Sequence, residues 1–220
     1  MLILALDTAT DKGSLALVAA DQLLAESSLE SRGAYLTRLL PEVEALFRHT
    51  GRQLAEIGAV AVSRGPGNFT GLRIGLATAK ALAWSLNCPL VAVPTMEALA
   101  AQFPCHPDPI GVLLDAKRNE VFWGLYRCPA DLPQELSPPE RLPLTQLRPR
   151  LTPPLTLTGP GLKVYGDFLE PSLPPGVTLA PPELREPRAA TVARLGRQRL
   201  AQGLTASPAQ LVPFYLRPAL

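Results

Sequence analysis

Residues 59–86 read AVAVSRGPGNFTGLRIGLATAKALAWSL, and this stretch decides the fold. The apolar run 59–62 predicts a β-strand, the glycine-rich run 65–68 predicts a tight loop, and apolar residues at helical spacing predict a helix over 71–86. Glycine permits close backbone approach, and the N–H groups at a helix start attract anions. The loop is therefore interpreted either as a phosphate or carboxylate site, or as a place where strand and helix must approach closely.

Small residues recur every fourth position along this predicted helix, at Gly71, Gly75, Ala79 and Ala83. On a helix they form one smooth ridge on which another element can pack closely. The ridge has two interpretations, because it can pack on the sheet of its own chain or meet a second chain.

The first residues predict three strands, over 2–6, 14–19 and 23–29. Asp7 follows the first strand and is itself followed by Thr8. An acid at this point can orient a metal-bound water or help to hold a phosphate-bearing ligand. The structural alternative is that its carboxylate caps an Asx-type turn.

The second half opens with a layout that repeats the first. A strand over 110–114 ends in Asp115, a turn follows at 117–119, and a second strand runs over 121–126. This repetition predicts two related halves. Prolines near residue 105 mark the boundary, which gives a first lobe of 1–104 and a second of 105–220. The proline-rich stretch 129–182 predicts loops and edge strands.

Composition and spacing exclude several classes of protein. The formal net charge of +2 gives no strong attraction to nucleic acid, and no apolar run approaches the roughly twenty residues of a membrane span. Three widely spaced cysteines favour a reducing, cytoplasmic setting. His49 and His106 are the only histidines and have no metal-binding spacing, and no nucleophile motif is present. We therefore expect neither a metal site nor catalytic residues.

Four stretches of the chain resemble landmarks of the TsaB (YeaZ) family in the same order. They are SRGPGNFTGLRIGLATAKALA at 63–83, ILALDTAT at 3–10, LLDAKRNEVFWGLY at 113–126 and VPFYLRP at 212–218. The resemblance implies an α/β fold of the actin, sugar kinase and Hsp70 (ASKHA) type with two related βββαβα-type lobes, the second proline-rich and partly degenerate. One departure is at Gly33 and Ala34, where many members carry a His-Ser pair before the first long helix.

The resemblance also implies a function. The family is a non-catalytic paralogue of TsaD, with which, together with TsaE, it supports transfer of a threonylcarbamoyl group to the adenosine beside the tRNA anticodon. The chain is then a scaffold or activator and not an enzyme, a homodimer when alone, with tRNA contacted through the complex. The alternative is a stand-alone kinase-like, nucleotide-dependent enzyme or a protease-like protein.

Two sets of site residues follow from the loop, the ridge and the resemblance. The first set is a candidate nucleotide or phosphate loop, for which we expect weak adenine-nucleotide binding and no required cofactor. It comprises Asp7, Thr8, Gly65, Pro66, Gly67, Asn68 and Asp115. The interface with TsaD or a second copy, on helices 36–49 and 71–86, comprises Leu36, Leu40, Thr70, Gly71, Arg73, Gly75, Ala79 and Ala83. On this interpretation Gly75→Leu abolishes association without unfolding the chain.

Overall fold

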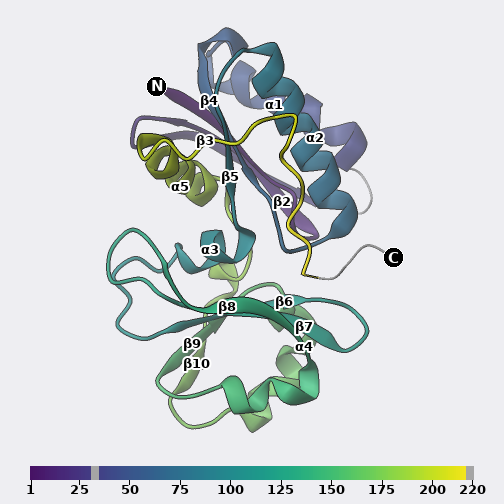
Figure 1. Ribbon diagram of the computed structural model, residues 1–220, viewed down its shortest axis with the longest axis vertical. Coiled ribbons are helices and arrows are strands. Elements are labelled where there is room, and N and C mark those ends of the chain that lie inside the picture. The colour runs from purple at the N-terminus through teal and green to yellow at the C-terminus, as the bar shows by residue number, and fades with distance from the viewer. Residues whose placement is uncertain (31–34, 217–220) are drawn as a thin grey trace. The chain divides into compact units, whose positions relative to one another are not determined.

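A computed structural model describes residues 1–30 and 35–216, which form two compact units. The first unit contains Met1–Ala98 and Pro187–Phe214, and the second contains Leu99–Glu186 with Tyr215 and Leu216. Each unit is built on its own five-stranded sheet (Figure 1). Gly33, Ala34 and the last residues of the VPFYLRP stretch lie outside the described residues.

The sheet of the first unit has the order β3-β2-β1-β4-β5. Its strands are β1 (Leu2–Asp7), β2 (Lys12–Ala19), β3 (Gln22–Glu30), β4 (Ile57–Ser63) and β5 (Leu90–Val93). The first three are antiparallel neighbours, whereas β4 runs parallel to β1 and β5 parallel to β4. The three predicted N-terminal strands and the predicted central strand are confirmed.

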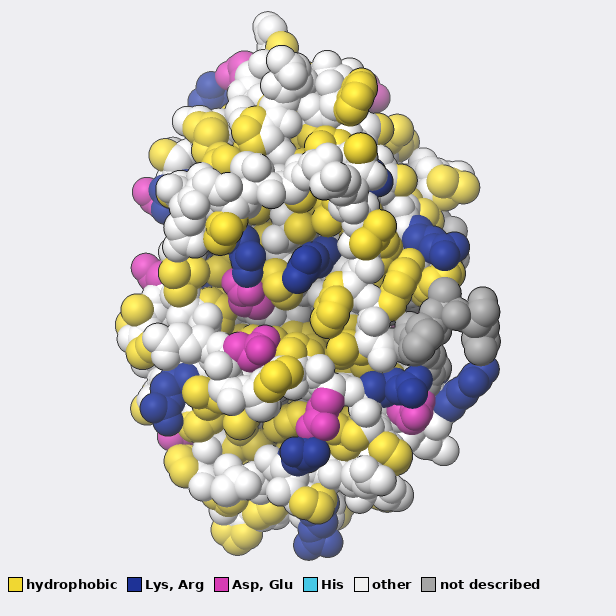
Figure 2. Space-filling view, in the orientation of Figure 1, with side chains coloured by type: hydrophobic (Ala, Val, Ile, Leu, Met, Phe, Trp, Pro, Cys, Tyr) yellow, Lys and Arg dark blue, Asp and Glu magenta, His cyan; other side chains and the backbone are white. Residues whose placement is uncertain are grey.

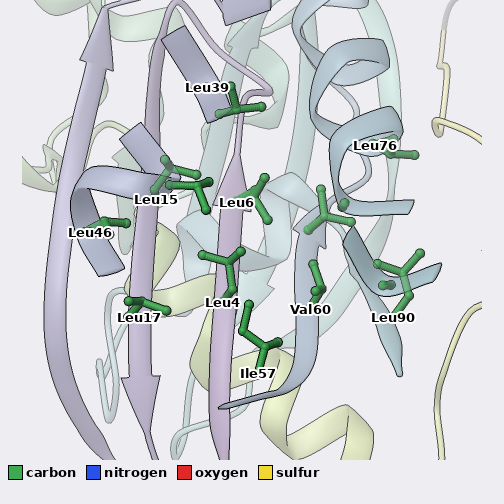
Figure 3. Packing of buried hydrophobic residues seen from close by; sticks show 14 of the residues in the cluster. Leu4, Leu6, Leu15, Leu17, Leu39, Leu46, Ile57, Val60, Leu76 and Leu90 are labelled. Atoms are coloured by element: carbon green, nitrogen blue, oxygen red, sulfur yellow. The ribbon is translucent and has the colours of Figure 1, made fainter. Parts of the chain in front are cut away.

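Helices α1 (Tyr35–Thr50) and α2 (Phe69–Ser85) pack against this sheet and against each other. Leu4 and Leu6 of β1 lie in one buried cluster with Leu39 of α1 and Leu76 of α2 (Figure 3). Alternate strand residues point to the opposite face, where Ala61 meets helix α5 (Ala189–Ala201). Both faces of the central strands are therefore covered, which explains their continuous apolar runs.

Helix α5 belongs to the first unit, although the sequence boundary assigned residues 105–220 to the second lobe. The backbone N–H of Ala189 donates to Ser14 Oγ (2.8 Å), and that of Ala190 donates to Glu26 Oε1 (3.0 Å). Strands β2 and β3 thus supply the caps that the start of α5 lacks in its own sequence. Gly196 lets the helix approach Ala61 closely. These contacts join segments far apart in the sequence, so a single linear boundary misses them.

The second unit repeats the topology of the first, with the sheet order β10-β9-β6-β7-β8. Its strands are β6 (Ile110–Asp115), β7 (Glu120–Arg127), β8 (Gln134–Pro143), β9 (Leu155–Thr158) and β10 (Val177–Leu179). In both units the first strand is central, is followed by two antiparallel strands, and has two parallel strands on its other side. This repetition confirms two related halves and the α/β fold of the ASKHA type.

The second unit is the simpler of the two. The described residues 144–154 between β8 and β9 hold only 3-10 helices, η2 (Leu144–Gln146) and η3 (Arg148–Arg150), where the first unit has α1. Sequence reasoning expected loops and edge strands over 129–182, and it missed the inner strand β9 and helix α4 (Gly161–Leu169). The remaining short helices are η1 (Leu54–Glu56), α3 (Thr95–Ala100), η4 (Glu170–Ser172) and η5 (Pro182–Leu184).

Charged side chains of both signs are interspersed over the face shown in Figure 2, without a large region of one sign. This distribution agrees with the small net charge of +2. Within the described residues, no helix has the length and apolar character that crossing a membrane requires.

Candidate functional site

Asp7 lies at the end of β1 and is completely buried. Its Oδ1 accepts a hydrogen bond from the backbone N–H of Ala9 (3.0 Å), and its Oδ2 accepts one from Ser63 Oγ at the end of β4. Burial raises the pKa of this carboxyl to about 6, against the opposing effect of the two hydrogen bonds. Asp7 therefore joins the ends of two neighbouring strands and caps the turn after β1. This is the structural role that the sequence left open.

The raised pKa of Asp7 predicts a pH dependence of stability. Because the folded pKa of about 6 exceeds the ordinary value of 3.8, the folded protein holds this proton more tightly than the unfolded chain. Stability is then lost as the pH rises from about 4 to about 6, by at most about 3 kcal/mol. We expect Asp7→Asn to remove this loss. Urea unfolding of both proteins at pH 4.5 and 7 tests it, and an equal pH response in the variant would contradict it.

The glycine loop packs closely on its own chain. A Cβ atom on Gly67 would lie 2.2 Å from the carbonyl oxygen of Ala9, and one on Gly65, whose φ is +112°, would lie 2.5 Å from that of Phe214. Pro66 between them is buried. Close backbone approach therefore explains both glycines without a ligand.

Asn68 is the N-cap of α2, and its side chain completes the packing of the loop. Its Oδ1 accepts from the backbone N–H of Gly71 (3.0 Å), while its Nδ2 donates to Asp11 Oδ1 (3.2 Å). Its own backbone N–H donates to the carbonyl of Ala9 (2.7 Å). The loop, the start of α2 and the turn after β1 are thus held as one arrangement by groups of the chain itself.

The ridge of small residues on α2 faces the interior of its own unit. Gly71, Gly75, Ala79 and Ala83 are all buried. A Cβ on Gly75 would lie 2.0 Å from Thr8 Oγ1, and this hydroxyl donates a hydrogen bond to the carbonyl of Gly71 (2.8 Å). The assignment of these four residues to an interface is therefore wrong, because they are buried within their own unit. The alternative interpretation of the ridge is the one observed.

The other predicted interface residues do face outward. Leu36 and Leu40 on α1 are 78% and 57% exposed, and Thr70 and Arg73 on α2 are exposed as well. The Arg73 guanidinium lies over the ring of Phe69, 3.8 Å from its centroid. These residues therefore lie on the exposed surface of the first unit.

Sequence reasoning missed part of the outward face of α2. Ala77 and Ala81 are exposed, and so is Trp84, at 75%. With Thr70 and Arg73 they follow a helical spacing displaced from the buried ridge. We call Leu36, Leu40, Thr70, Arg73, Ala77, Ala81 and Trp84 the outer α1–α2 face. The helical spacing of Trp84 from Arg73, Ala77 and Ala81, off the small-residue ridge, was the signal in the sequence that marked it.

Asp115 lies in the second unit, whereas the other six residues of the predicted loop site lie in the first. Its Oδ1 accepts from the backbone N–H of Lys117 (2.7 Å) and from Tyr165 Oη (2.8 Å), and its Oδ2 pairs with Lys117 Nζ (2.7 Å). Burial alone would raise the pKa of Asp115, but the hydrogen bonds from Lys117 and Tyr165 outweigh it and lower the pKa. Burial and the bond to Asp115 raise the pKa of Tyr165 to about 12.

A second Gly-Pro-Gly sequence, which the sequence reasoning missed, connects β9 to α4. A Cβ on Gly159, whose φ is +108°, would lie 2.2 Å from the carbonyl oxygen of Leu113 on β6, and one on Gly161 would lie 2.8 Å from it. Each unit thus has a Gly-Pro-Gly loop before a helix, packed on Leu113 of β6 in the second unit and on Ala9, just after β1, in the first. Repetition of the tripeptide was the available signal.

Neither histidine enters a metal site or a catalytic set among residues 1–30 and 35–216. His106 Nε2 lies 2.9 Å from Thr156 Oγ1, which in turn lies 3.1 Å from Thr178 Oγ1, and the His106 ring stacks on Phe103. His49 is exposed near the end of α1. Within these ranges no group of three or more His, Cys, Asp or Glu side chains could hold a metal ion.

Known proteins resemble the chain over its whole length. The family model of TsaD, described as tRNA N6-adenosine threonylcarbamoyltransferase, matches residues 23–132. The tRNA threonylcarbamoyladenosine biosynthesis protein TsaB of Bacillus subtilis is 31% identical over 222 residues, which cover 100% of this chain and 95% of the relative. The chain belongs to the TsaB family.

Two further comparisons agree with membership in the TsaB family. The TsaB protein of Escherichia coli is 30% identical over 225 residues, which cover 99% of this chain and 95% of the relative. A crystal structure from Pseudomonas aeruginosa, of an uncharacterized protein with similarity to peptidase YEAZ, has a TM-score of 0.83 at 28% identity and covers 98% of this chain and 99% of that chain. The resemblance inferred from the sequence is thereby confirmed.

Proposed function

We propose that this chain is a non-catalytic subunit in the biosynthesis of tRNA threonylcarbamoyladenosine. It binds TsaD, with TsaE, and enables transfer of the threonylcarbamoyl group to tRNA. The observation that carries the proposal is the match to relatives named for this biosynthesis over 95% of their length. The similarity to these relatives extends over both units of the chain, so it includes the complete fold of such a subunit.

The arrangement of the candidate residues supports a subunit without its own chemistry. The buried carboxyl of Asp7 is engaged with Ser63 and Ala9, and that of Asp115 with Lys117 and Tyr165. A general base needs access to the proton that it removes, and Asp7 has no exposed surface. Among the described residues no carboxylate hydrogen bonds to His106, so its contact with Thr156 lacks the third member of a nucleophilic triad.

The outer α1–α2 face supports a role through binding. Leu36, Leu40 and Trp84 expose apolar side chains on two adjacent helices, and Arg73 is exposed on the second of them. Aromatic residues and arginine are enriched at the centres of protein interfaces. We assign this face to TsaD and, for the chain alone, to a second copy.

Reconstituted transfer tests the proposal. The adenylate-forming enzyme, TsaD and TsaE are mixed with an unmodified tRNA transcript, with and without this chain, and the modified nucleoside is quantified after digestion of the tRNA. We expect product only when the chain is present, and none from the chain without TsaD. Equal product in its absence would overturn the proposed role, and product from the chain alone would make it an enzyme.

A further inference from the structure

The turn between β6 and β7 has a backbone that its own sequence does not favour. Lys117, Arg118 and Asn119 are consecutive and have φ values of 62°, 58° and 58°. Residues with side chains rarely adopt this left-handed region, because Cβ approaches the carbonyl oxygen too closely, and they adopt it as single residues rather than in runs. No glycine relieves the crowding at these three positions, and only Asn119 is of a type that tolerates the left-handed region, so Lys117 and Arg118 carry the unfavourable conformation.

The topology does not impose this conformation. In the first unit, residues 8–11 connect the equivalent strands β1 and β2 with a loop of the same length as 116–119. Asp7 also accepts a hydrogen bond from the residue two positions later, as Asp115 does. Residues 8–11 are nevertheless free of positive φ values. The left-handed run is thus a property of this turn and not of the fold.

Surrounding contacts hold the turn from both sides. Asp115 binds the backbone N–H and the Nζ of Lys117, and Tyr165 on α4 donates to the same carboxylate. At the other end, the carbonyl of Asn119 accepts from the backbone N–H of Leu144 (2.9 Å). An unfavourable backbone conformation persists only where its surroundings determine it in this way, and such positions cluster at functional sites.

Of the cationic side chains around the turn, Arg118 is the one without an ion pair among the described residues. Lys117 pairs with Asp115 at 2.7 Å, and Arg141 pairs with Glu120 at 3.8 Å. Arg118 is exposed, and within residues 1–30 and 35–216 its side chain has no ion pair or hydrogen bond. The turn therefore presents a guanidinium on a fixed backbone, and its planar donors match the oxygens of a phosphate group.

We propose that Arg118 contacts the phosphate backbone of an RNA, which on the proposed function is the tRNA bound by the assembled complex. The formal net charge is only +2, so general attraction between this chain and RNA is small. An arginine without an ion pair that is presented by a fixed turn, as Arg118 is, then accounts for a measurable share of any contact. The fixed turn also avoids the loss of backbone entropy that ordering a flexible loop would cost.

The experiment measures binding of an unmodified tRNA transcript to the complex of TsaD, TsaE and this chain over a series of salt concentrations. We expect Arg118→Ala to weaken binding by about three- to tenfold and to reduce the slope of log affinity against log salt by about one. Arg118→Lys keeps the charge and should retain the slope. Arg127→Ala, at an exposed arginine at the end of β7, is the matched control and should behave as the unaltered protein does.

Three outcomes would overturn this inference. The first is an unchanged tRNA affinity and salt slope in Arg118→Ala, and the second is an equal effect of Arg127→Ala. The third is a loss of assembly with TsaD or TsaE at an unchanged salt slope, which would mean that Arg118 contacts a protein and not RNA. Failure of the proposed function is seen separately, because the transfer assay then gives product without the chain. If the chain is required for transfer but Arg118→Ala binds tRNA normally, only the present inference fails.

Discussion

Gly75→Leu is expected to destabilise the first unit strongly rather than to prevent association of an otherwise intact chain. A Cβ at this position would lie 2.0 Å from Thr8 Oγ1 and 3.2 Å from its Cβ. Thr8 cannot easily move away, because it is fully buried and its hydroxyl is bonded to the carbonyl of Gly71. We expect a loss of about 3 kcal/mol or more from the free energy of unfolding, a large part of the stability of an ordinary domain.

Ala77→Leu is the matched control for Gly75→Leu, since it adds a leucine to the exposed side of the same helix. Leucine is a good helix former, so we expect a change in stability within about 0.5 kcal/mol. Urea unfolding followed by circular dichroism measures both variants. A normal unfolding midpoint for Gly75→Leu would mean that the ridge faces outward, which would restore its assignment to an interface.

The ridge on α2 shows what residue spacing in a sequence can predict about a helix and what it cannot. Spacing alone predicted the helix, observed as α2, and grouped Gly71, Gly75, Ala79 and Ala83 on one side of it. Spacing does not say which side meets the sheet, because small residues suit close packing within a chain as well as between chains. The deciding contact is Thr8, which lies far from α2 in the sequence.

The two strand-end aspartates were also predictable, but their partners were not. A polar residue after a continuous apolar run identified both Asp7 and Asp115 as strand ends. Ser63 and Tyr165 reach them from other elements of the same unit, and no local pattern indicates such pairs. The same limit applies to α5, whose start is capped by Ser14 and Glu26 across the chain.

Prolines account for the largest gap in the prediction of the second unit. Pro138 and Pro139 lie within β8, which is tolerated because β8 is an edge strand with only β7 beside it. Pro160 precedes α4, where a helix start needs no backbone donor. Proline density indicated irregular structure over 129–182, although these prolines occupy positions that strands and helices accept.

Trp84→Asp is expected to weaken association with TsaD by about 30-fold or more, as loss of a central aromatic anchor costs about 2 kcal/mol of binding free energy. Trp84 is 75% exposed, so the substitution removes little packing in the free chain and its stability should be largely retained. Leu40→Asp, on the neighbouring helix, should act in the same direction. Sedimentation of the chain mixed with TsaD measures the association.

Leu204→Asp supplies the control for this pair of variants. Leu204 is 52% exposed, close to the 57% of Leu40, but it follows α5, which packs on the opposite face of the first sheet from α1 and α2. An effect of Trp84→Asp and Leu40→Asp without an effect of Leu204→Asp locates binding on the outer α1–α2 face, since all three add the same charge. If the proposed interface is right, transfer to tRNA should fall in proportion to the association that each variant loses. Equal association of all three variants with TsaD would instead exclude the outer α1–α2 face from the interface.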